Sequence, residues 1–377
     1  MDWAMREMGT VELGEQRLNH RVIALLDRLG ANAQASIPVA CGSWAETKAA
    51  YRLFVNAKVN AEKVLSPHRQ AILERIKQEK TVLIVQDTTP LNFSGQLNRT
   101  DIGPLTGDKH RGILLHPTVA VTPKRVCLGV IDNYHWSREA LRGSENSKEK
   151  NRENHKIPFK AKESYRWVMG YQKAQEIARL AETTRIVTVA DREGDLSDLY
   201  HEAYTSTQST SAYWLIRAIR NRRLLDAKGN FQRLKMIEMV KNTQPVGTIE
   251  LELPASTHSG RRQVQQAIYA AQVRLNPPDR KRKKTSHEIV EAYVVIATEL
   301  NPPTNQAPIE WVLLTHVDFN DQVTPYVIVQ WYLCRWQIEV YFRILKSGCQ
   351  TGGVSCVAGH RSPYPLLSAD KCAMAQR

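Results

Sequence analysis

The sequence predicts an α/β protein with a helical N-terminal domain and a β-rich insertion in its second half. Residues 1–75 carry apolar positions at helical spacing. Two short apolar runs, Val82–Val85 and Ile186–Val189, have the composition of buried strands, and an aspartate stands just past each of them. From about residue 247 to residue 297 the pattern is that of further strands. Helices, buried strands and a β-rich block in this order define the fold class.

Composition points to a polyanionic partner. The chain has 377 residues, of which 42% are hydrophobic, enough for a large core with one or two smaller modules. Its formal net charge is +14, more than solubility requires. No apolar run of about 18 residues is present, and the N-terminal segment contains acids and no apolar signal core. We therefore expect an intracellular protein with no membrane partner.

The six cysteines predict free thiols in a reducing compartment. They form no CxxC pair and show no disulfide-framework spacing. A zinc site built from Cys349, Cys356, His360 and Cys372 is the alternative, but these spacings match no zinc-finger pattern.

Two helices are expected in the N-terminal segment. The first, in LGEQRLNHRVIALLDRLG, places Arg17, Arg21 and Arg28 among apolar positions and ends at Gly30. A turn-rich connector at 36–42 then leads to a second helix over 44–54. A small helical domain with a basic side suits duplex DNA, and a capping subdomain without a ligand is the alternative.

The first strand ends next to Asp87. Because a strand delivers the following residue to a fixed place at the edge of its sheet, Asp87 is well positioned for chemistry. A lone aspartate after a strand is more often a turn residue or a helix cap. We expect Pro90 to end this segment.

The segment that follows predicts a hairpin, a loop and a helix. GILLHPTVAVTP and RVCLGVIDNYHW are two strands joined at Pro123 and Lys124. Residues 137–162 are hydrophilic and basic, as expected of a solvated loop that contacts phosphates. Residues 163–182 are predicted to form a helix.

The second aspartate follows the strand Ile186–Val189 in the same way. Asp191 is succeeded by Arg192, Glu193, Gly194 and Asp195, and we expect Gly194 to permit a tight turn into a helix that Asp195 or Ser197 caps. If the two strands are neighbours, their aspartates lie at one edge of the sheet. Two carboxylates in that arrangement outline a site for a hard cation.

Arginine inside the next strand is a candidate ligand contact. Arg217 lies in WLIRAI, and a charge within an apolar strand requires an anionic partner. Within the β-rich block, the basic run NPPDRKRKKTSH is either a solvated hairpin tip or a phosphate-tracking finger. IEWVLLTH is one more strand, and it contains Trp311.

The segment from Trp331 to Lys346 has the composition of one helix, with Gly348 as a stop signal. At about 100° per residue, four polar side chains share an arc roughly 60° wide. They are Tyr332, Arg335, Glu339 and Lys346. An ordinary solvated helix with an internal salt bridge is the simplest interpretation of this pattern alone.

Three motifs together resemble the DDE transposases of bacterial insertion sequences, in the branch with the Tyr-Arg-Glu-Lys signature. They are TVLIVQDTT, VTVADREGD, and the set Tyr332, Arg335, Glu339 and Lys346. The resemblance extends from the LGEQRLNHR segment to about Gln350. It implies a ribonuclease H-like fold, a mixed sheet flanked by helices, and a metal triad of Asp87, Asp191 and Glu339. Two Mg²⁺ ions, for which Mn²⁺ substitutes, are the implied cofactors.

The resemblance also implies roles for the remaining site residues. Arg217 is similar to a residue that contacts the end of the element near the cleavage point. Trp311 and Trp336 look like aromatic residues that hold a displaced base, with a place in the core as the alternative. Tyr332, Arg335 and Lys346 would hold phosphates on either side of the cut.

We accordingly expect five parts in the chain. They are residues 1–75 as the DNA-binding domain, 76–225 as the first part of the catalytic domain, 226–303 as the β-rich insertion, 304–350 as the second catalytic part, and 351–377 as an atypical tail. The expected activity is cut-and-paste transposition, with binding to the terminal inverted repeats, strand cleavage and strand transfer. The expected partners are double-stranded DNA, as element ends and target, and a second copy in a homodimeric synaptic complex. The expected location is the bacterial cytoplasm, at the nucleoid.

The tail after Gln350 departs from the family pattern. It is rich in small residues, Cys and Pro, as in a truncated or frame-shifted chain, which puts the homodimer in doubt. A truncated, catalytically silent DNA-binding regulator of transposition is therefore the alternative function, and a general metal nuclease is a third.

Overall fold

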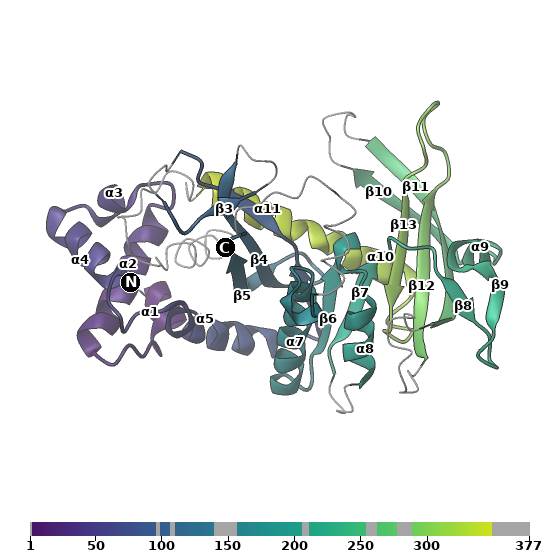
Figure 1. Ribbon diagram of the computed structural model, residues 1–377, viewed down its shortest axis with the longest axis horizontal. Helices are drawn as coiled ribbons and strands as arrows, with labels where there is room; N and C mark the ends of the chain where they lie inside the picture. The colour runs from purple at the N-terminus through teal and green to yellow at the C-terminus, as the bar shows by residue number, and fades with distance from the viewer. Residues whose placement is uncertain are drawn as a thin grey trace. The chain divides into compact units, whose positions relative to one another are not determined.

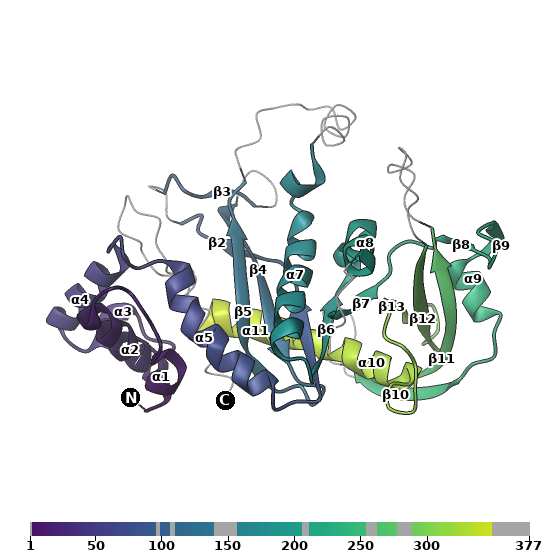
Figure 2. The same ribbon diagram turned by 90° about the horizontal axis from the view of Figure 1, so that it is seen from below.

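The computed structural model describes residues 2–95, 99–105, 110–138, 157–205, 211–253, 262–276 and 289–348. The chain divides into two compact units, of which the first combines Met1–Arg166 with Trp336–Arg377 and the second is Trp167–Arg335. Figures 1 and 2 show the elements of each. No helix among the described residues has the length and apolar character needed to cross a membrane. The predicted basic run at 276–287, apart from residue 276, most of the predicted loop at 137–162 and the tail from 349 lie outside the described residues.

Helices fill the N-terminal part of the first unit, as predicted. They are α1 (Asp2–Met8), α2 (Gln16–Ala31), α3 (Ile37–Cys41), α4 (Trp44–Phe54) and α5 (Ala61–Ile76). Buried side chains between Ala4 and Val64 form a core of their own. The bounds of α4 are those predicted, and the Ser43 hydroxyl caps it by accepting from the Glu46 N–H at 3.3 Å.

Two details of the N-terminal prediction were wrong. The expected connector at 36–42 contains the short helix α3, which ends at Gly42 with a φ of 74°. Gly30 does not end the first helix, because α2 continues to Ala31. Arg28 lies on the predicted basic side, but it forms an ion pair with Glu46 that joins α2 to α4.

The sheet of the first unit is organised around one long strand. Its strands are β1 (Thr81–Gln86), β2 (Thr89–Asn92), β3 (Gly103–Pro104), β4 (Arg111–Val121) and β5 (Cys127–Trp136). Each of the other four pairs with β4 in antiparallel orientation. The predicted strand at Val82–Val85 and the predicted hairpin are confirmed. Pro90 was expected to end its segment, but it lies inside β2, at the end of the strand order, where proline is tolerated.

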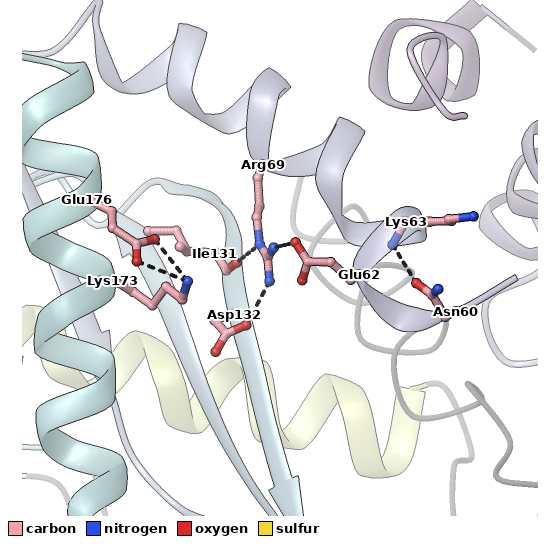
Figure 3. Close-up of polar contacts among 8 residues, drawn as sticks. All are labelled: Asn60, Glu62, Lys63, Arg69, Ile131, Asp132, Lys173 and Glu176. Carbon is pink, nitrogen blue, oxygen red and sulfur yellow. Dashed lines mark hydrogen bonds and ion pairs between the residues drawn. The ribbon is translucent and has the colours of Figure 1, made fainter. Parts of the chain in front are cut away.

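Helix α5 is fastened to β5 by arginine side chains. Arg69 donates from Nε to the Ile131 carbonyl at 2.6 Å and from Nη2 to Asp132 at 2.8 Å (Figure 3). One turn and a half further on, Arg75 donates to the Leu128 carbonyl at 2.9 Å. These contacts connect the helix that follows the N-terminal core to the sheet. Figure 1 shows α5 on one side of β4 and β5 and α11 (Gln337–Arg343) on the other.

The second unit contains a mixed sheet with helices beside it. Its helices are α7 (Tyr165–Leu180, from Trp167 on), α8 (Ser197–Thr205), α9 (Met236–Lys241) and α10 (Pro325–Leu333). Its strands are β6 (Arg185–Ala190), β7 (Tyr213–Arg217), β8 (Arg223–Leu225), β9 (Phe231–Lys235), β10 (Gly247–Leu253), β11 (Arg262–Leu275), β12 (Val290–Glu299) and β13 (Glu310–Thr315). The order is β6-β7-β13-β12-β11-β8-β9, with β10 on β11. Only the β6–β7 pair of this unit is parallel among the described strand pairs.

The β-rich block therefore continues a larger sheet. β12 pairs with β13 from Tyr293 opposite Thr315 to Thr298 opposite Glu310, and β13 pairs in turn with β7. The mixed α/β class predicted from the sequence is confirmed in this coarse form. The strands of the 226–303 segment, β9 to β12, belong to the same sheet as β7, which carries Arg217, and β13, which carries Trp311.

The helix expected from Trp331 to Lys346 is interrupted. Helix α10 begins at Pro325, where the Thr324 side chain accepts from the Val327 N–H, and a 3₁₀ turn, Cys334–Trp336, separates it from α11. A π-helical turn, Ile344–Gly348, follows α11. Because 3₁₀ and π turns advance by angles other than 100° per residue, the uniform polar face derived from a single α-helix was wrong. No Gly or Pro lies in the 3₁₀ turn, and the π turn has a glycine, Gly348, only as its last residue.

Candidate functional site

The predicted site residues are divided between the two units. The first unit contains Asp87, Trp336, Glu339 and Lys346. The second unit contains Asp191, Arg217, Trp311, Tyr332 and Arg335. Each group has its own geometry, and each is built by different elements.

Asp87 occupies the strand-end position that the sequence predicted. It follows β1 directly and is half-buried, and its Oδ1 accepts a hydrogen bond from the Thr88 N–H at 2.7 Å. Both of its chain neighbours are engaged by side chains from elsewhere. The Gln86 Oε1 lies 3.0 Å from His116 Nε2, and the Thr88 hydroxyl lies 2.9 Å from His116 Nδ1.

Arg166 completes this arrangement. Its Nε donates to the Thr88 hydroxyl at 2.8 Å, and its Nη1 donates to the Glu163 carbonyl at 2.8 Å. Arg166 is 9% exposed and its guanidinium lies over the Trp136 ring, 5.5 Å from the centroid. Burial, reinforced by the nearby Arg166 charge, lowers the pKa of His116 well below its usual value. Sequence reasoning missed both His116 and Arg166. Their signal was a histidine and an arginine in otherwise apolar, buried stretches.

Glu339 and Lys346 lie on the C-terminal part of the first unit. Glu339 is exposed on α11, a helix that packs against β1, the strand preceding Asp87. Lys346 is in the π turn, where partial loss of hydration lowers the pKa of its ammonium although the residue remains exposed. Trp336 is half-buried in the 3₁₀ turn.

In the second unit, Tyr332 is the centre of a cluster of predicted residues. It is 4% exposed, and its ring centroid lies 6.0 Å from that of Trp311. Its hydroxyl lies close enough to the Arg217 guanidinium for that group to lower the pKa of Tyr332. Burial raises the pKa of Tyr332, the charges of Arg335 and Arg217 oppose that rise, and the Asp191 carboxylate adds to it. Five residues that the sequence analysis selected for different reasons are thus brought together in one unit.

Arg217 is better described as a strand-end residue than as a charge inside a strand. β7 ends at Arg217, and its Nη2 donates to the Glu310 carbonyl at 3.2 Å. Trp311, on the neighbouring strand, is 5% exposed. That degree of burial is typical of a core side chain, and its role in holding a base stays a prediction.

Asp191 also occupies its predicted strand-end position. Its carboxylate accepts from the Glu193 N–H at 2.9 Å and so caps the short 3₁₀ turn Arg192–Gly194. Gly194 is required here by packing, since a Cβ at this position would lie 2.6 Å from the Ala190 Cβ. Its backbone does not have a positive φ, so the conformational reason given for this glycine was wrong.

Asp195 was expected to cap the following helix, and it has a different role. Its buried carboxylate forms an ion pair with Arg222 and accepts from the Tyr200 hydroxyl at 2.6 Å. The Ile219 and Arg220 N–H groups donate to the same carboxylate at 2.9 and 3.2 Å. Burial raises the pKa of Asp195, but the hydrogen bonds and the Arg222 charge outweigh it and hold that pKa below its usual value. Asp195 therefore fixes the loop that leaves β7 immediately after Arg217.

The donor types in the predicted triad suit a hard cation. Carboxylate oxygens are the ligands that Mg²⁺ prefers, and Asp87, Asp191 and Glu339 are half-buried or exposed, within reach of solvent. In the described parts of the chain, no group of three or more His, Cys, Asp or Glu side chains is already arranged around a common metal position. The triad thus stays a prediction made from the sequence.

Comparison with known proteins gives a family match from sequence and similar solved structures. Residues 1–59 match the family model described as transposase DNA-binding. The structure is similar to that of a piggyBac transposase in a synaptic complex with hairpin DNA, with a TM-score of 0.39 and 10% sequence identity. That similarity covers 96% of this chain, whereas the chain spans 64% of the length of its counterpart.

Proposed function

We propose that this protein is a DNA transposase that uses residues 1–59 to bind the terminal inverted repeats of its own insertion sequence. The observation that carries the proposal is the match of this segment to the transposase DNA-binding family. The net charge of +14 supports DNA as the partner, because a polyanion neutralises such an excess. Carboxylates in the sequence after residue 59 would then catalyse DNA cleavage and strand transfer.

The catalytic carboxylates in this proposal are Asp87, Asp191 and Glu339. Two of them stand directly after buried strands, and the third stands on a helix packed against the first of those strands. Bound Mg²⁺ or Mn²⁺, in two sites, would supply activation of the attacking oxygen and stabilisation of the leaving oxygen. In this proposal the fold is ribonuclease H-like and the reaction is cut-and-paste transposition.

The cluster around Tyr332 supports a phosphate-binding role for the second unit. Arg217 and Arg335 supply cationic donors, and guanidinium groups match the geometry of phosphate oxygens. The buried ring of Tyr332 holds its hydroxyl against Arg217, which restricts the orientation of that guanidinium. In this proposal Lys346, in the first unit, also contacts DNA phosphates, and Trp311 and Trp336 stack on a displaced base.

The decisive experiment is cleavage of a labelled duplex that carries the terminal repeat, in Mg²⁺ or Mn²⁺. We expect the wild-type chain to cut it, and Asp87→Ala, Asp191→Ala and Glu339→Ala each to reduce cutting by at least about 1,000-fold while binding of the duplex is retained. Glu176→Gln is the matched control, because Glu176 is an exposed carboxylate that forms a surface ion pair with Lys173 on α7. It should cut like the wild type.

The other outcomes have specific meanings. Binding without cutting by the wild-type chain would favour the silent regulator over the transposase. Equal cutting of duplexes with and without the repeat would favour a general nuclease. A triad variant that still cuts at the wild-type rate would remove its residue from the site. Light scattering on the DNA complex would test the proposed homodimer of the synaptic complex.

A further inference from the structure

We infer that Arg166, Thr88 and His116 form a positioning chain that fixes the Asp87 carboxylate for metal binding. The inference deepens the proposed function and depends on it only for the role of Asp87 as a metal ligand. None of the three residues would contact the metal or DNA phosphates in this role. They would act through the backbone on either side of Asp87.

The directions of the hydrogen bonds in this positioning chain follow from its two ends, Arg166 and the Gln86 amide oxygen. A guanidinium can only donate, so the Thr88 hydroxyl accepts from Arg166 Nε at 2.8 Å. The hydroxyl proton of Thr88 is then available for His116 Nδ1, 2.9 Å away. A hydroxyl oxygen can accept twice, so Arg166 alone does not fix the histidine. The Gln86 Oε1 lies 3.0 Å from His116 Nε2 and can only accept, which places the imidazole proton on Nε2 and leaves Nδ1 to accept from Thr88. Each of the three hydrogen bonds that join Arg166, Thr88, His116 and Gln86 then has one donor and one acceptor.

The imidazole has to be neutral for this arrangement, and its surroundings keep it so. His116 is 1% exposed, and burial together with the charge of Arg166 disfavours the imidazolium. In this positioning chain the His116 imidazole is therefore neutral and carries its proton on Nε2. The positioning chain also has little freedom to rearrange, because Gln86, His116 and Arg166 are buried and Thr88 is half-buried.

Arg166 is itself held at several points. Its Nη1 donates to the Glu163 carbonyl, and its guanidinium lies over Trp136. The Glu163 side chain accepts from Trp136 Nε1 at 3.0 Å and from Nε and Nη2 of Arg138, both at 2.7 Å. Arg138 and Trp136 thus fix Glu163, and Glu163 with Trp136 fixes Arg166. The Arg166 guanidinium that donates to Thr88 is thus itself held in place by Glu163 and Trp136.

The consequence for Asp87 is that both of its neighbours are clamped. Gln86 is bound by His116 and Thr88 is bound by His116 and Arg166, so the peptide groups around Asp87 have fixed orientations. Its carboxylate is further held by the Thr88 N–H at 2.7 Å. A metal-binding carboxylate held in this way loses less conformational entropy when it binds a cation, and partners of this kind raise metal affinity by about 10- to 100-fold.

The position of the chain argues against a purely structural role. Buried charged networks are weak sources of stability, since apolar side chains of similar volume often stabilise a fold as well. This network places a buried arginine and a buried histidine on the two residues next to Asp87, where an apolar replacement would leave the loop after β1 free to move.

Thr88→Val and Thr88→Ser form the critical pair of variants in the full-length chain. Valine has nearly the shape of threonine but cannot accept from Arg166 or donate to His116, whereas serine keeps the hydroxyl. Thr122→Val, which removes a hydroxyl that accepts from the Val126 N–H in the β4–β5 turn, is the control for hydroxyl loss elsewhere in the same unit. Mn²⁺ binding is measured by calorimetry, and cleavage of the repeat duplex is measured over a range of Mn²⁺ concentrations.

We expect Thr88→Val to weaken Mn²⁺ binding by about 10-fold or more and to raise the Mn²⁺ concentration for half-maximal cleavage by a similar factor. Duplex binding should remain at the wild-type level. Thr88→Ser should restore Mn²⁺ affinity to within about 3-fold of the wild type, and Thr122→Val should leave it unchanged. The inference is overturned if Thr88→Val binds Mn²⁺ as the wild type does, or if the wild type binds none. If calorimetry shows weaker Mn²⁺ binding by Thr88→Val than by the wild type, but the wild type does not cleave the repeat duplex, the positioning role of Thr88 is supported and the transposase function is rejected.

Discussion

The two strand-end aspartates follow the same sequence pattern but are supported in different ways. Asp191 is held locally, because it caps a turn two residues ahead. Asp195, four residues further along, holds the loop after β7 through contacts with residues 24 to 27 positions away. Asp87 has one local hydrogen bond, while His116 and Arg166, 28 and 78 residues away from Thr88 in the chain, hold its neighbours. A short motif can therefore be complete in one unit and depend on distant residues in the other.

The largest effect on stability is expected when the buried ion pair between Asp195 and Arg222 in the second unit is broken. Asp195→Asn removes the buried charge that pairs with Arg222, whose side chain is 14% exposed, and leaves that cation uncompensated. The loss of one partner from a buried ion pair costs about 3–5 kcal/mol. Urea unfolding of this variant should show that decrease in the free energy of unfolding. Asp321→Asn, at an exposed aspartate in the same unit, is the control and should change it by less than about 0.5 kcal/mol.

If Asp195→Asn were instead as stable as the wild type, the claim that Asp195 stabilises the second unit by holding the loop after β7 would be wrong. Activity adds a further comparison. An amide has one acceptor oxygen where the carboxylate has two, so some of the donors from Tyr200, Ile219, Arg220 and Arg222 would lose their acceptor. The loop after Arg217 should therefore loosen, and DNA cleavage should fall in the fraction that remains folded.

The first unit contains a comparable buried cluster, and its effect depends on pH. Glu7 is hydrogen-bonded to His68 and accepts from Arg75 Nη1 and Nη2 at 2.9 and 2.8 Å. Burial raises the pKa of Glu7, but the His68 and Arg75 contacts outweigh it and lower that pKa from 4.5 to about 2. Because the folded pKa is below the unfolded one, the stabilisation is complete above pH 4.5 and is lost as the pH falls towards 2.

This shift corresponds to about 3 kcal/mol. Glu7→Gln should therefore lower the free energy of unfolding at pH 6 by up to that amount, and the difference from the wild type should shrink between pH 4.5 and pH 2.5. Urea titrations at several pH values measure both quantities. A difference that stays constant over this range would show that the Glu7 carboxylate is not the titrating group.

Sequence reasoning succeeded for features that depend on neighbouring residues. The strands before Asp87 and Asp191, helix α4 and the β-rich block all follow from local apolar patterns and propensities. It failed where long-range packing decides. The sequence near Thr88 does not identify Arg166 as its partner. The sequence around Arg335 does not predict a 3₁₀ turn. Gly194 was recognised, but its reason, the closeness of Ala190, is visible only in three dimensions.

The smallest effect on stability is expected at Tyr332, and it separates folding from function most sharply. Tyr332→Phe keeps the ring against Trp311 and removes only the hydroxyl that lies close to Arg217, which still donates to the Glu310 carbonyl. Even the loss of a hydrogen bond costs only about 0.5–1.5 kcal/mol. We expect cleavage of the repeat duplex to fall by more than that stability change explains, because the Arg217 guanidinium loses its orientation towards a phosphate. Tyr326→Phe, on the same helix, removes an exposed hydroxyl that accepts from Gln330 and should change neither quantity. Equal cleavage by Tyr332→Phe and the wild type would mean that the buried cluster of the second unit serves its core, and would leave DNA contact to the exposed residues of the first.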